Sequence, residues 1–227
     1  MRNYNYALFH IKLIDRIVKN KRNKFFEFIK SKIDTENLKS YLDIGTTEDT
    51  VSESSNYLNH KFDFIKIHKS ISDQNIVNKR FNNILKKSIT QNFSKEEIEK
   101  FKSDLVISNA TIEHVGSRAK QIKMVENMID LTENYLIVQT INRYFPIETH
   151  TKIPLIHFLP NNIYRTIYRF IGFKYHSLEE NLNLLSFKDI NKIFVSFNNK
   201  IDYKIFKIST FGFTSNHLVI CKKRTPF

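Results

Sequence analysis

The sequence of 227 residues is long enough to bury a substantial core within a single domain. It is 41% hydrophobic and 26% charged, and no apolar run approaches the roughly 20 residues that span a bilayer. A single cysteine, Cys221, excludes an intrachain disulfide and a cysteine-based metal cluster. Because the N-terminus also lacks the pattern of a signal peptide, we expect a cytoplasmic protein.

The chain carries 36 Lys and Arg against 23 Asp and Glu, a net charge of +13 that suggests a nucleic-acid partner. However, Lys, Asn, Ile and Phe are abundant throughout, whereas there are only four Gly, four Pro and no Trp. This composition indicates a coding bias that spreads lysine over the whole chain. We therefore interpret the charge as a solvated basic surface and keep nucleic-acid binding as an alternative.

Residues 5–33 are predicted to be helical, with a polar basic stretch at 19–24 that can divide them into two helices. Their apolar face comprises Leu8, Ile11, Ile14, Val18, Phe25, Phe26 and Ile29. One interpretation is a cover helix packed on a sheet. The other is a basic amphipathic helix that makes weak peripheral contact with an anionic membrane.

Three strands are expected in the next part of the chain. The first, at 41–45, is apolar and ends in a glycine, and residues 46–50 then open a helix. The second strand is predicted at 62–67 and a short third strand at 85–89. Ser94 and Glu97 form a capping box that predicts the start of another helix.

The most informative stretch begins at Asp104. An apolar run at 105–107 stops at the polar tip Ser108-Asn109, a helical pattern spans 122–131, and a second apolar run follows at 135–138. Strand, polar tip, helix and strand form a parallel crossover unit. Since α/β sheets bind ligands beyond the carboxyl ends of their strands, the tip after residue 107 is the first place to look for function.

Residues 141–161 have no clean periodicity and contain three of the four prolines, which predicts a lid or a binding loop. A helix is predicted at 162–171, ended by Gly172, and another from Ser186 to Phe194. The apolar runs at 203–209 and 217–221 are expected to pair antiparallel at a sheet edge.

Two motifs resemble the class I methyltransferases, which use S-adenosylmethionine. Asp43-Ile44-Gly45 resembles the motif that ends the first strand of that family, and residues 104–115 resemble the motif around its fourth strand. A bacterial subgroup is similar over a longer set of positions: Asn142-Arg143, Phe145–Glu148, His150-Thr151, Pro154-Leu155, His157, Leu159-Pro160, Glu180–Ser186 and Ser215-Asn216. The resemblance covers roughly residues 38–222.

The resemblance implies a Rossmann-like, doubly wound α/β fold. Its seven-stranded sheet is mostly parallel, with an antiparallel C-terminal strand and helices on both faces. We divide the chain into an N-terminal helical cover segment, residues 1–34, and a methyltransferase domain, residues 35–227. The implied function is methyl transfer from S-adenosylmethionine to an oxygen or nitrogen of a small molecule or a glycan precursor.

The resemblance also implies the residues that bind the cofactor, with Ser88 or Thr90 as the polar contact to the adenine after the third strand. They are Asp43, Gly45, Thr46, Ser88, Ser108, Asn109 and Glu113. The catalytic or acceptor-side candidates are His114, Glu148, His150 and His157. Histidine suits a general base near neutral pH, although these four side chains can equally serve to fix loops. The spacing of Glu148, His150 and His157 matches no metal signature, so we expect no metal.

Two departures from the family pattern leave a further alternative open. Thr47 occupies a position where a second glycine is common, and the carboxylate expected after the second strand to bind the ribose is unclear, with Asp63, His68 and Asp73 in the neighbourhood. A protein that keeps the fold but has lost the cofactor site is therefore the non-catalytic alternative.

Overall fold

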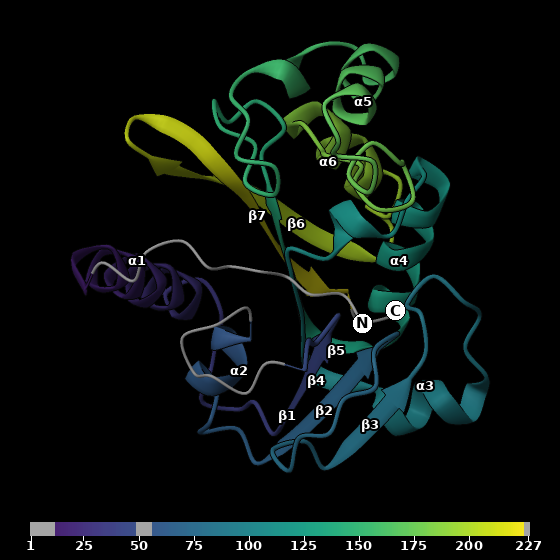
Figure 1. Ribbon diagram of the computed structural model, residues 1–227. Coiled ribbons are helices and arrows are strands. Elements are labelled where there is room, and N and C mark those ends of the chain that lie inside the picture. The colour runs from purple at the N-terminus through teal and green to yellow at the C-terminus, as the bar shows by residue number, and fades with distance from the viewer. Residues whose placement is uncertain (1–11, 49–55, 225–227) are drawn as a thin grey trace.

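The computed structural model describes residues 12–48 and 56–224. Its centre is a seven-stranded sheet with the order β3-β2-β1-β4-β5-β7-β6 (Figure 1). The strands are β1 (Ser40–Ile44), β2 (Ile67–Ser72), β3 (Asn83–Lys86), β4 (Ser103–Asn109), β5 (Thr132–Ile141), β6 (Ile201–Thr210) and β7 (Phe213–Lys223). Strands β1 to β5 are parallel, and β7 pairs antiparallel with both β5 and β6. The predicted doubly wound sheet with an antiparallel C-terminal strand is confirmed.

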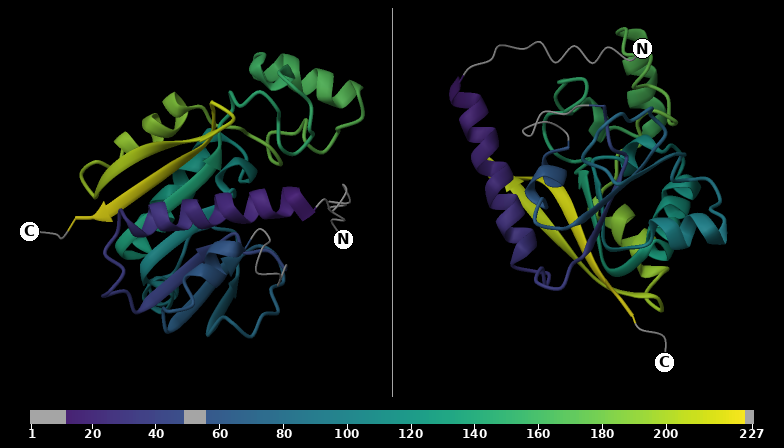
Figure 2. Two further views of the ribbon diagram at one scale, coloured as in Figure 1. Left: turned by 90° about the vertical axis from the view of Figure 1, so that its left-hand side faces the viewer. Right: turned by 90° about the horizontal axis from the view of Figure 1, so that it is seen from below.

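Helices cover both faces of the sheet (Figure 2). The α-helices are α1 (Lys12–Lys30), α2 (Tyr57–Lys61), α3 (Lys95–Phe101), α4 (Arg118–Asp130), α5 (Asn161–Phe170) and α6 (Phe187–Val195), with short 3-10 turns η1 (Ile112–His114) and η2 (Ile156–Phe158). On one face, Phe26 and Ile29 of α1 share a core with Leu105 and Ile137. On the other face, α4 and α6 pack on the strand residues that point the opposite way, such as Val106 and Leu136.

The alternation along β4 explains why its sequence is a continuous apolar run. Leu105 and Ile107 point into the core beneath α1, whereas Val106 points into the core beneath α4. A strand covered on both faces gains from apolar side chains at every position, so it shows no polar alternation. The same holds for Leu136 and Ile137 of β5.

The helical signals in the sequence are confirmed where they rest on local capping. Ser94 and Glu97 form the capping box of α3, and Ser186 and Asp189 form that of α6. Helix α1 is continuous through residues 19–24 and is not divided there. Leu8, Ile11 and part of the helix predicted at 46–50 lie outside the described residues, and contact of the N-terminal helix with a membrane stays a prediction.

The second strand was predicted at residues 62–67, but in the structure it starts only where that range ends. Residues 62–66 form a turn after α2, and β2 begins only at Ile67. Phe62 is buried and stacks on Tyr41, whereas Phe64 is 52% exposed. The alternating apolar pattern of these residues therefore belongs to a turn that packs against the core, not to a strand. Similarly, β3 runs from Asn83 to Lys86, earlier than the predicted 85–89.

The segment between β5 and α6 forms a lobe that lies beyond the carboxyl ends of the parallel strands (Figure 1). We call residues 142–185 the lobe. It contains α5 and, before it, residues 142–160, which include η2 and which we call the proline-rich loop. An isolated bridge between Ile147 and Pro154 ties this loop together. In the described part of the chain, no helix combines the length and the apolar character that crossing a bilayer requires.

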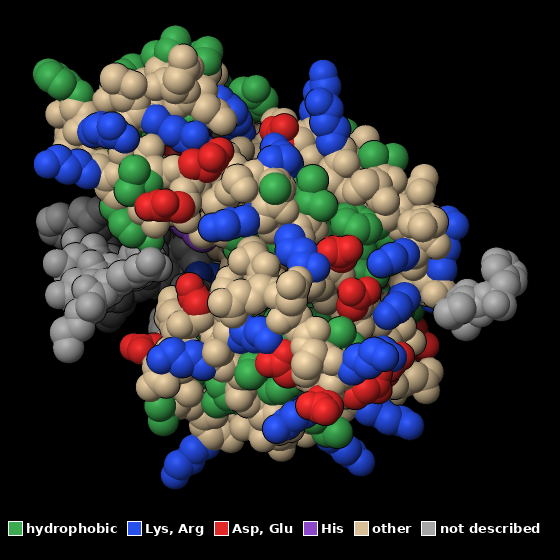
Figure 3. Space-filling view, turned by 90° about the vertical axis from the view of Figure 1, so that its right-hand side faces the viewer, with side chains coloured by type: hydrophobic (Ala, Val, Ile, Leu, Met, Phe, Trp, Pro, Cys, Tyr) green, Lys and Arg blue, Asp and Glu red, His purple; other side chains and the backbone are tan. Residues whose placement is uncertain are grey.

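Basic and acidic side chains are interspersed on the face shown in Figure 3. Ion pairs between basic and acidic side chains of the described residues include Lys123–Glu126 and Lys87–Glu97. This face therefore does not gather its positive charge into one continuous band.

Candidate functional site

A cavity of about 1830 Å³ opens where β1, β2, β4 and β5 end. Its walls are the turns that follow these strands, together with Arg22, Phe25 and Phe28 of α1 on one side and parts of the lobe on the other. Ligands of open α/β sheets bind at this edge. The cavity is therefore the candidate site, and the loop after β4 borders it as expected.

Asp43 lies near the end of β1 and lines the cavity. Its carboxylate accepts hydrogen bonds from Thr46 Oγ1 and Asn59 Nδ2, both at 2.9 Å. Burial raises the pKa of the Asp43 carboxyl to about 6, even though these hydrogen bonds favour its ionised form. The wall of the cavity thus holds a carboxylate that titrates just below neutral pH.

Gly45 makes the turn after β1, with a φ of +82° in the left-handed region. A β-carbon at this position would lie 2.3 Å from Oγ1 of Thr111 and 2.5 Å from its Cγ2. Thr111 belongs to the loop after β4 and donates a hydrogen bond to the carbonyl of Ile44 at 3.3 Å. The two loops meet at Gly45, and only glycine fits between them.

The two threonines after Gly45 have different positions. Thr46 is buried behind the turn, where its hydroxyl accepts a hydrogen bond from Ser70 Oγ at 2.8 Å, and it does not line the cavity. Thr47 does line the cavity. Its amide and hydroxyl donate to Oδ1 of Asn56 at 3.2 and 3.3 Å, so hydrogen bonds to Asn56 fix the position of this side chain.

The carboxylate that follows the second strand is Asp73. It comes directly after Ser72, the last residue of β2, and it is exposed and lines the cavity. His68 instead lies near the start of β2, buried against Tyr41, and Asp63 pairs with Arg80. The sequence-based site omitted Asp73 because the second strand was placed too early.

The remaining cofactor-side predictions divide between the cavity and the core. Ser88, which follows β3, lines the cavity and lies 3.0 Å from Oγ1 of Thr90. Asn109, the last residue of β4, also lines it. Ser108 is fully buried within β4, and its hydroxyl has no hydrogen-bond partner among the described residues.

Glu113 and His114 belong to the η1 turn after β4. Glu113 is fully buried and accepts a hydrogen bond from Thr140 Oγ1 at 2.8 Å. His114 lines the cavity, and its Nδ1 lies 2.7 Å from the carbonyl oxygen of Asn181. Burial lowers the pKa of His114 despite the neighbouring carboxylate, so its imidazole is neutral at pH 7.

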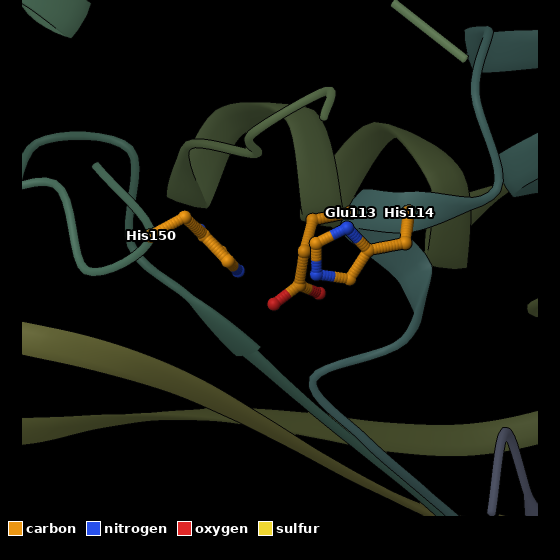
Figure 4. A group of neighbouring side chains, drawn as sticks. All are labelled: Glu113, His114 and His150. Carbon is orange, nitrogen blue, oxygen red and sulfur yellow. The ribbon is translucent and has the colours of Figure 1, made fainter. Parts of the chain in front are cut away.

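His150 reaches the same place from the proline-rich loop (Figure 4). Its ring lies 4.7 Å from that of His114, centroid to centroid, in an edge-on arrangement, and it lines the cavity. Nδ1 of His150 lies 2.6 Å from Oε1 of Glu148. The structure therefore brings together His114 and His150, which are 36 positions apart in the sequence (150 − 114).

Glu148 and His157 do not line the cavity. Glu148 is buried, and its carboxylate also accepts hydrogen bonds from the amides of His150 and Thr151, at 2.9 and 2.6 Å. Burial alone would raise the pKa of Glu148, but these bonds and the His150 ring lower it to about 2. His157 Nε2 lies 2.8 Å from the carbonyl oxygen of Phe145, within the loop. Both residues shape the loop that carries His150.

His176 is a cavity residue that the sequence analysis did not consider. Its ring lies 6.0 Å from that of His150, and it comes from the segment between α5 and α6. Burial lowers its pKa, as does the nearby His150. No local sequence signal marks it, because only the folding of the lobe brings it to the cavity.

No protein-family model and no curated protein sequence matches the chain. Among solved structures it is similar to magnesium protoporphyrin IX methyltransferase from Synechocystis PCC 6803 with bound SAH, with a TM-score of 0.53, 12% identity, and coverage of 97% of this chain and 90% of that chain. It is also similar to N-methyltransferase NodS from Bradyrhizobium japonicum WM9, with a TM-score of 0.50, 8% identity and coverage of 93% and 99%.

A further similar structure is the small RNA methyltransferase HEN1, with a TM-score of 0.55, 12% identity, and coverage of 90% of this chain and 25% of that chain. These identities are low, so the similarity concerns the fold. The chain has the class I fold of S-adenosylmethionine-dependent methyltransferases.

Proposed function

We propose that the protein transfers a methyl group from S-adenosylmethionine to an oxygen or nitrogen of a small molecule or a glycan precursor. One observation carries this proposal: a single cavity joins the Asp43–Gly45 turn to the imidazoles of His114 and His150. The first feature suits a charged nucleoside cofactor, and the second suits an acceptor that must lose a proton.

On the cofactor side, each proposed contact follows from the chemistry of the group. Gly45 lets the cofactor approach the backbone closely. We assign the ribose hydroxyls to the carboxylate of Asp73, which directly follows β2 and lines the cavity. Asp43 supplies negative charge near the cationic part of the cofactor. Ser88 and Asn109 add polar contacts, whereas Thr46 supports the turn from behind and Ser108 is buried within β4.

On the acceptor side, the reaction is an in-line displacement. The acceptor atom attacks the methyl carbon, the carbon–sulfur bond breaks, and its electron pair stays on sulfur. Because the sulfonium is already activated, the protein mainly aligns the reactants and excludes water. The remaining task is removal of the acceptor's proton, and His114 and His150 are the groups that we assign to it.

Calorimetric titration with S-adenosylmethionine and S-adenosylhomocysteine tests this proposal. We expect micromolar binding to the wild type and roughly 10- to 100-fold weaker binding to Asp73→Asn, which loses a charged hydrogen-bond acceptor. Asp202→Asn is the matched control, because Asp202, on β6, pairs with Arg224 beyond the end of β7 and does not line the cavity. Absence of binding to the folded, cofactor-free wild type would favour the non-catalytic alternative.

A nucleic-acid acceptor is the second candidate, favoured by the net charge of +13. It predicts RNA or DNA binding that persists above physiological salt and methyl transfer to the nucleic acid. Filter binding across a salt series separates the two acceptors. Weak affinity that disappears at moderate salt, without methylation, supports the small-molecule acceptor.

A further inference from the structure

We propose that Glu113, His114 and His150 bind a divalent first-row transition-metal ion beside the cavity. One carboxylate oxygen of Glu113 and one ring nitrogen of each histidine all lie within 4.8 Å of one another. The three side chains converge from the η1 turn and the proline-rich loop (Figure 4). Two imidazoles and one carboxylate form a donor set that suits zinc, iron or cobalt.

The hydrogen bonds of the two histidines use Nδ1 of each ring and leave Nε2 available to bind a metal. Nδ1 of His114 donates to the carbonyl oxygen of Asn181 at 2.7 Å, and Nδ1 of His150 donates to the carboxylate of Glu148 at 2.6 Å. Each Nε2 then keeps its lone pair. Histidines that bind metals typically donate their other ring N–H to a carboxylate or a backbone carbonyl in this way.

Glu113 supplies the independent observation that points to a cation. Its side chain is fully buried, and Oε2 accepts a hydrogen bond from Thr140 at 2.8 Å. Oε1 is buried as well and has no hydrogen-bond partner among the described residues. A buried carboxylate oxygen without a partner is unfavourable, and a bound cation satisfies it directly.

The distances allow the three donors to share one ion. Two ligand atoms at about 2.1 Å from a tetrahedral ion lie about 3.4 Å apart. The present separations of up to 4.8 Å exceed this value, so binding of an ion requires the three side chains to move closer together. Because three protein ligands leave at least one position open, and His114 and His150 line the cavity, the open position faces the cavity.

The metal site deepens the proposed function, on which this step rests, because it favours a hydroxyl acceptor. An alcohol oxygen that coordinates the ion loses its proton to water more readily, since the cation lowers its pKa. The resulting alkoxide forms the new carbon–oxygen bond, the carbon–sulfur bond breaks, and S-adenosylhomocysteine leaves. Both histidines then act as ligands, the ion acidifies the hydroxyl, and water accepts the proton.

The experiment titrates the metal-stripped full chain with Zn²⁺ by calorimetry and with Co²⁺ by visible absorption. We expect one ion per chain with micromolar or tighter affinity, and Co²⁺ bands typical of four or five ligands. Glu113→Gln and His150→Ala should each weaken binding at least tenfold and remove the bands. His60→Ala is the matched control, because this histidine of α2 does not line the cavity, and it should bind like the wild type.

Thermal unfolding guards against variants that merely fail to fold. Zn²⁺ should raise the melting temperature of the wild type and of His60→Ala, but not that of Glu113→Gln. Equal Zn²⁺ affinity of the wild type and Glu113→Gln would overturn the proposal, as would a wild type that binds no ion.

Titration with S-adenosylhomocysteine on the same samples distinguishes this failure from failure of the proposed function. Cofactor binding without metal binding overturns the metal site alone. Metal binding without cofactor binding supports the metal site and contradicts methyl transfer.

Discussion

The two ends of the cavity are built in different ways. At the end proposed for the cofactor, Gly45 and Asp73 directly follow strands and Asp43 lies one residue before a strand end, so the register of the sheet places them. At the end proposed for the acceptor, His114 and His150 come from an irregular turn and a loop. A hydrogen bond to Asn181 of the lobe places His114, and a hydrogen bond to Glu148 within its own loop places His150. Substitutions should therefore act through backbone geometry at the first end and through lost polar contacts at the second.

The largest effect is expected for Gly45→Ala. The new β-carbon would collide with Thr111 in addition to the strain of a positive φ, so we expect a loss of about 3 kcal/mol in the free energy of unfolding and cofactor binding weakened more than 100-fold. Gly172→Ala has a comparable φ of +95° but nothing within 4 Å of the new β-carbon, and should lose only about 1 kcal/mol. Urea unfolding and calorimetry measure both. Equal losses would show that backbone strain, not contact between the loops, makes Gly45 necessary.

Glu148→Gln should have the next largest effect, at the acceptor end. The change removes a buried carboxylate that accepts three hydrogen bonds around His150, so we expect a loss of about 2 kcal/mol and a 10- to 100-fold lower turnover. Cofactor affinity should stay within a factor of about three, because the cofactor end is independent. A similar loss of cofactor affinity would contradict the division of the cavity into two ends.

The same carboxylate predicts a pH dependence of stability. The pKa of Glu148 falls from 4.5 to about 2 on folding, so its stabilising contribution is present above pH 4.5 and is lost as the pH falls towards 2. The wild type should therefore lose its advantage over Glu148→Gln in that range. Urea unfolding of both proteins at pH 6, 4 and 3 measures the gap, and a constant gap would show that Glu148 is not ionised in the fold.

Asp43 should contribute a pH dependence of stability with the opposite sign to that of Glu148. Burial raises its pKa from 3.8 to about 6, so its contribution to stability is fully present below pH 3.8 and is lost as the pH rises through 6. If the ionised form binds the cationic cofactor, affinity should rise about tenfold from pH 5 to pH 7. Calorimetry at both pH values tests this, and Asp43→Asn should show a flat profile. A tenfold rise in the variant as well would assign the effect to another group.

The smallest effect on catalysis is expected for His157→Gln. His157 bonds the carbonyl of Phe145 and does not line the cavity, so we expect a loss of about 1 kcal/mol in stability with kcat/KM within threefold of the wild type. A 100-fold decrease in kcat with unchanged KM would instead place His157 among the groups that act on the acceptor.

The predictions from the sequence were wrong where tertiary packing, rather than neighbouring residues, decides the structure. Predictions that depend on neighbouring residues are confirmed. They are the helix starts at Ser94 and Ser186, the apolar run that forms β4, and the glycine turn after β1. The second strand was misplaced because Phe62 is apolar for a tertiary reason, its packing on Tyr41. Because of that error, Asp73 was named only as one of several neighbours of the ribose-binding position and was not chosen for the cofactor site.

At the end proposed for the acceptor, the residue types in the sequence correctly pointed to the loop that borders the cavity, but they did not predict which of its side chains face the cavity. Glu148, His150 and His157 lie within ten positions of one another, yet only His150 faces the cavity, since the loop turns the other two inward. The approach of Glu113 to His150 was not foreseen, and the expectation of no metal rested on the spacing of a different set of residues.

The sequence by itself determined the fold class, the strand that carries the first motif and the loop after β4, because these depend on periodicity and on short-range turn chemistry. Only the tertiary structure decided which polar side chains share a cavity. His114, His150 and His176 belong to three separate segments, and only the packing of the lobe over the sheet edge brings them together. Spacing along the chain is not informative about such contacts, because loops of any length can close them at little extra entropic cost.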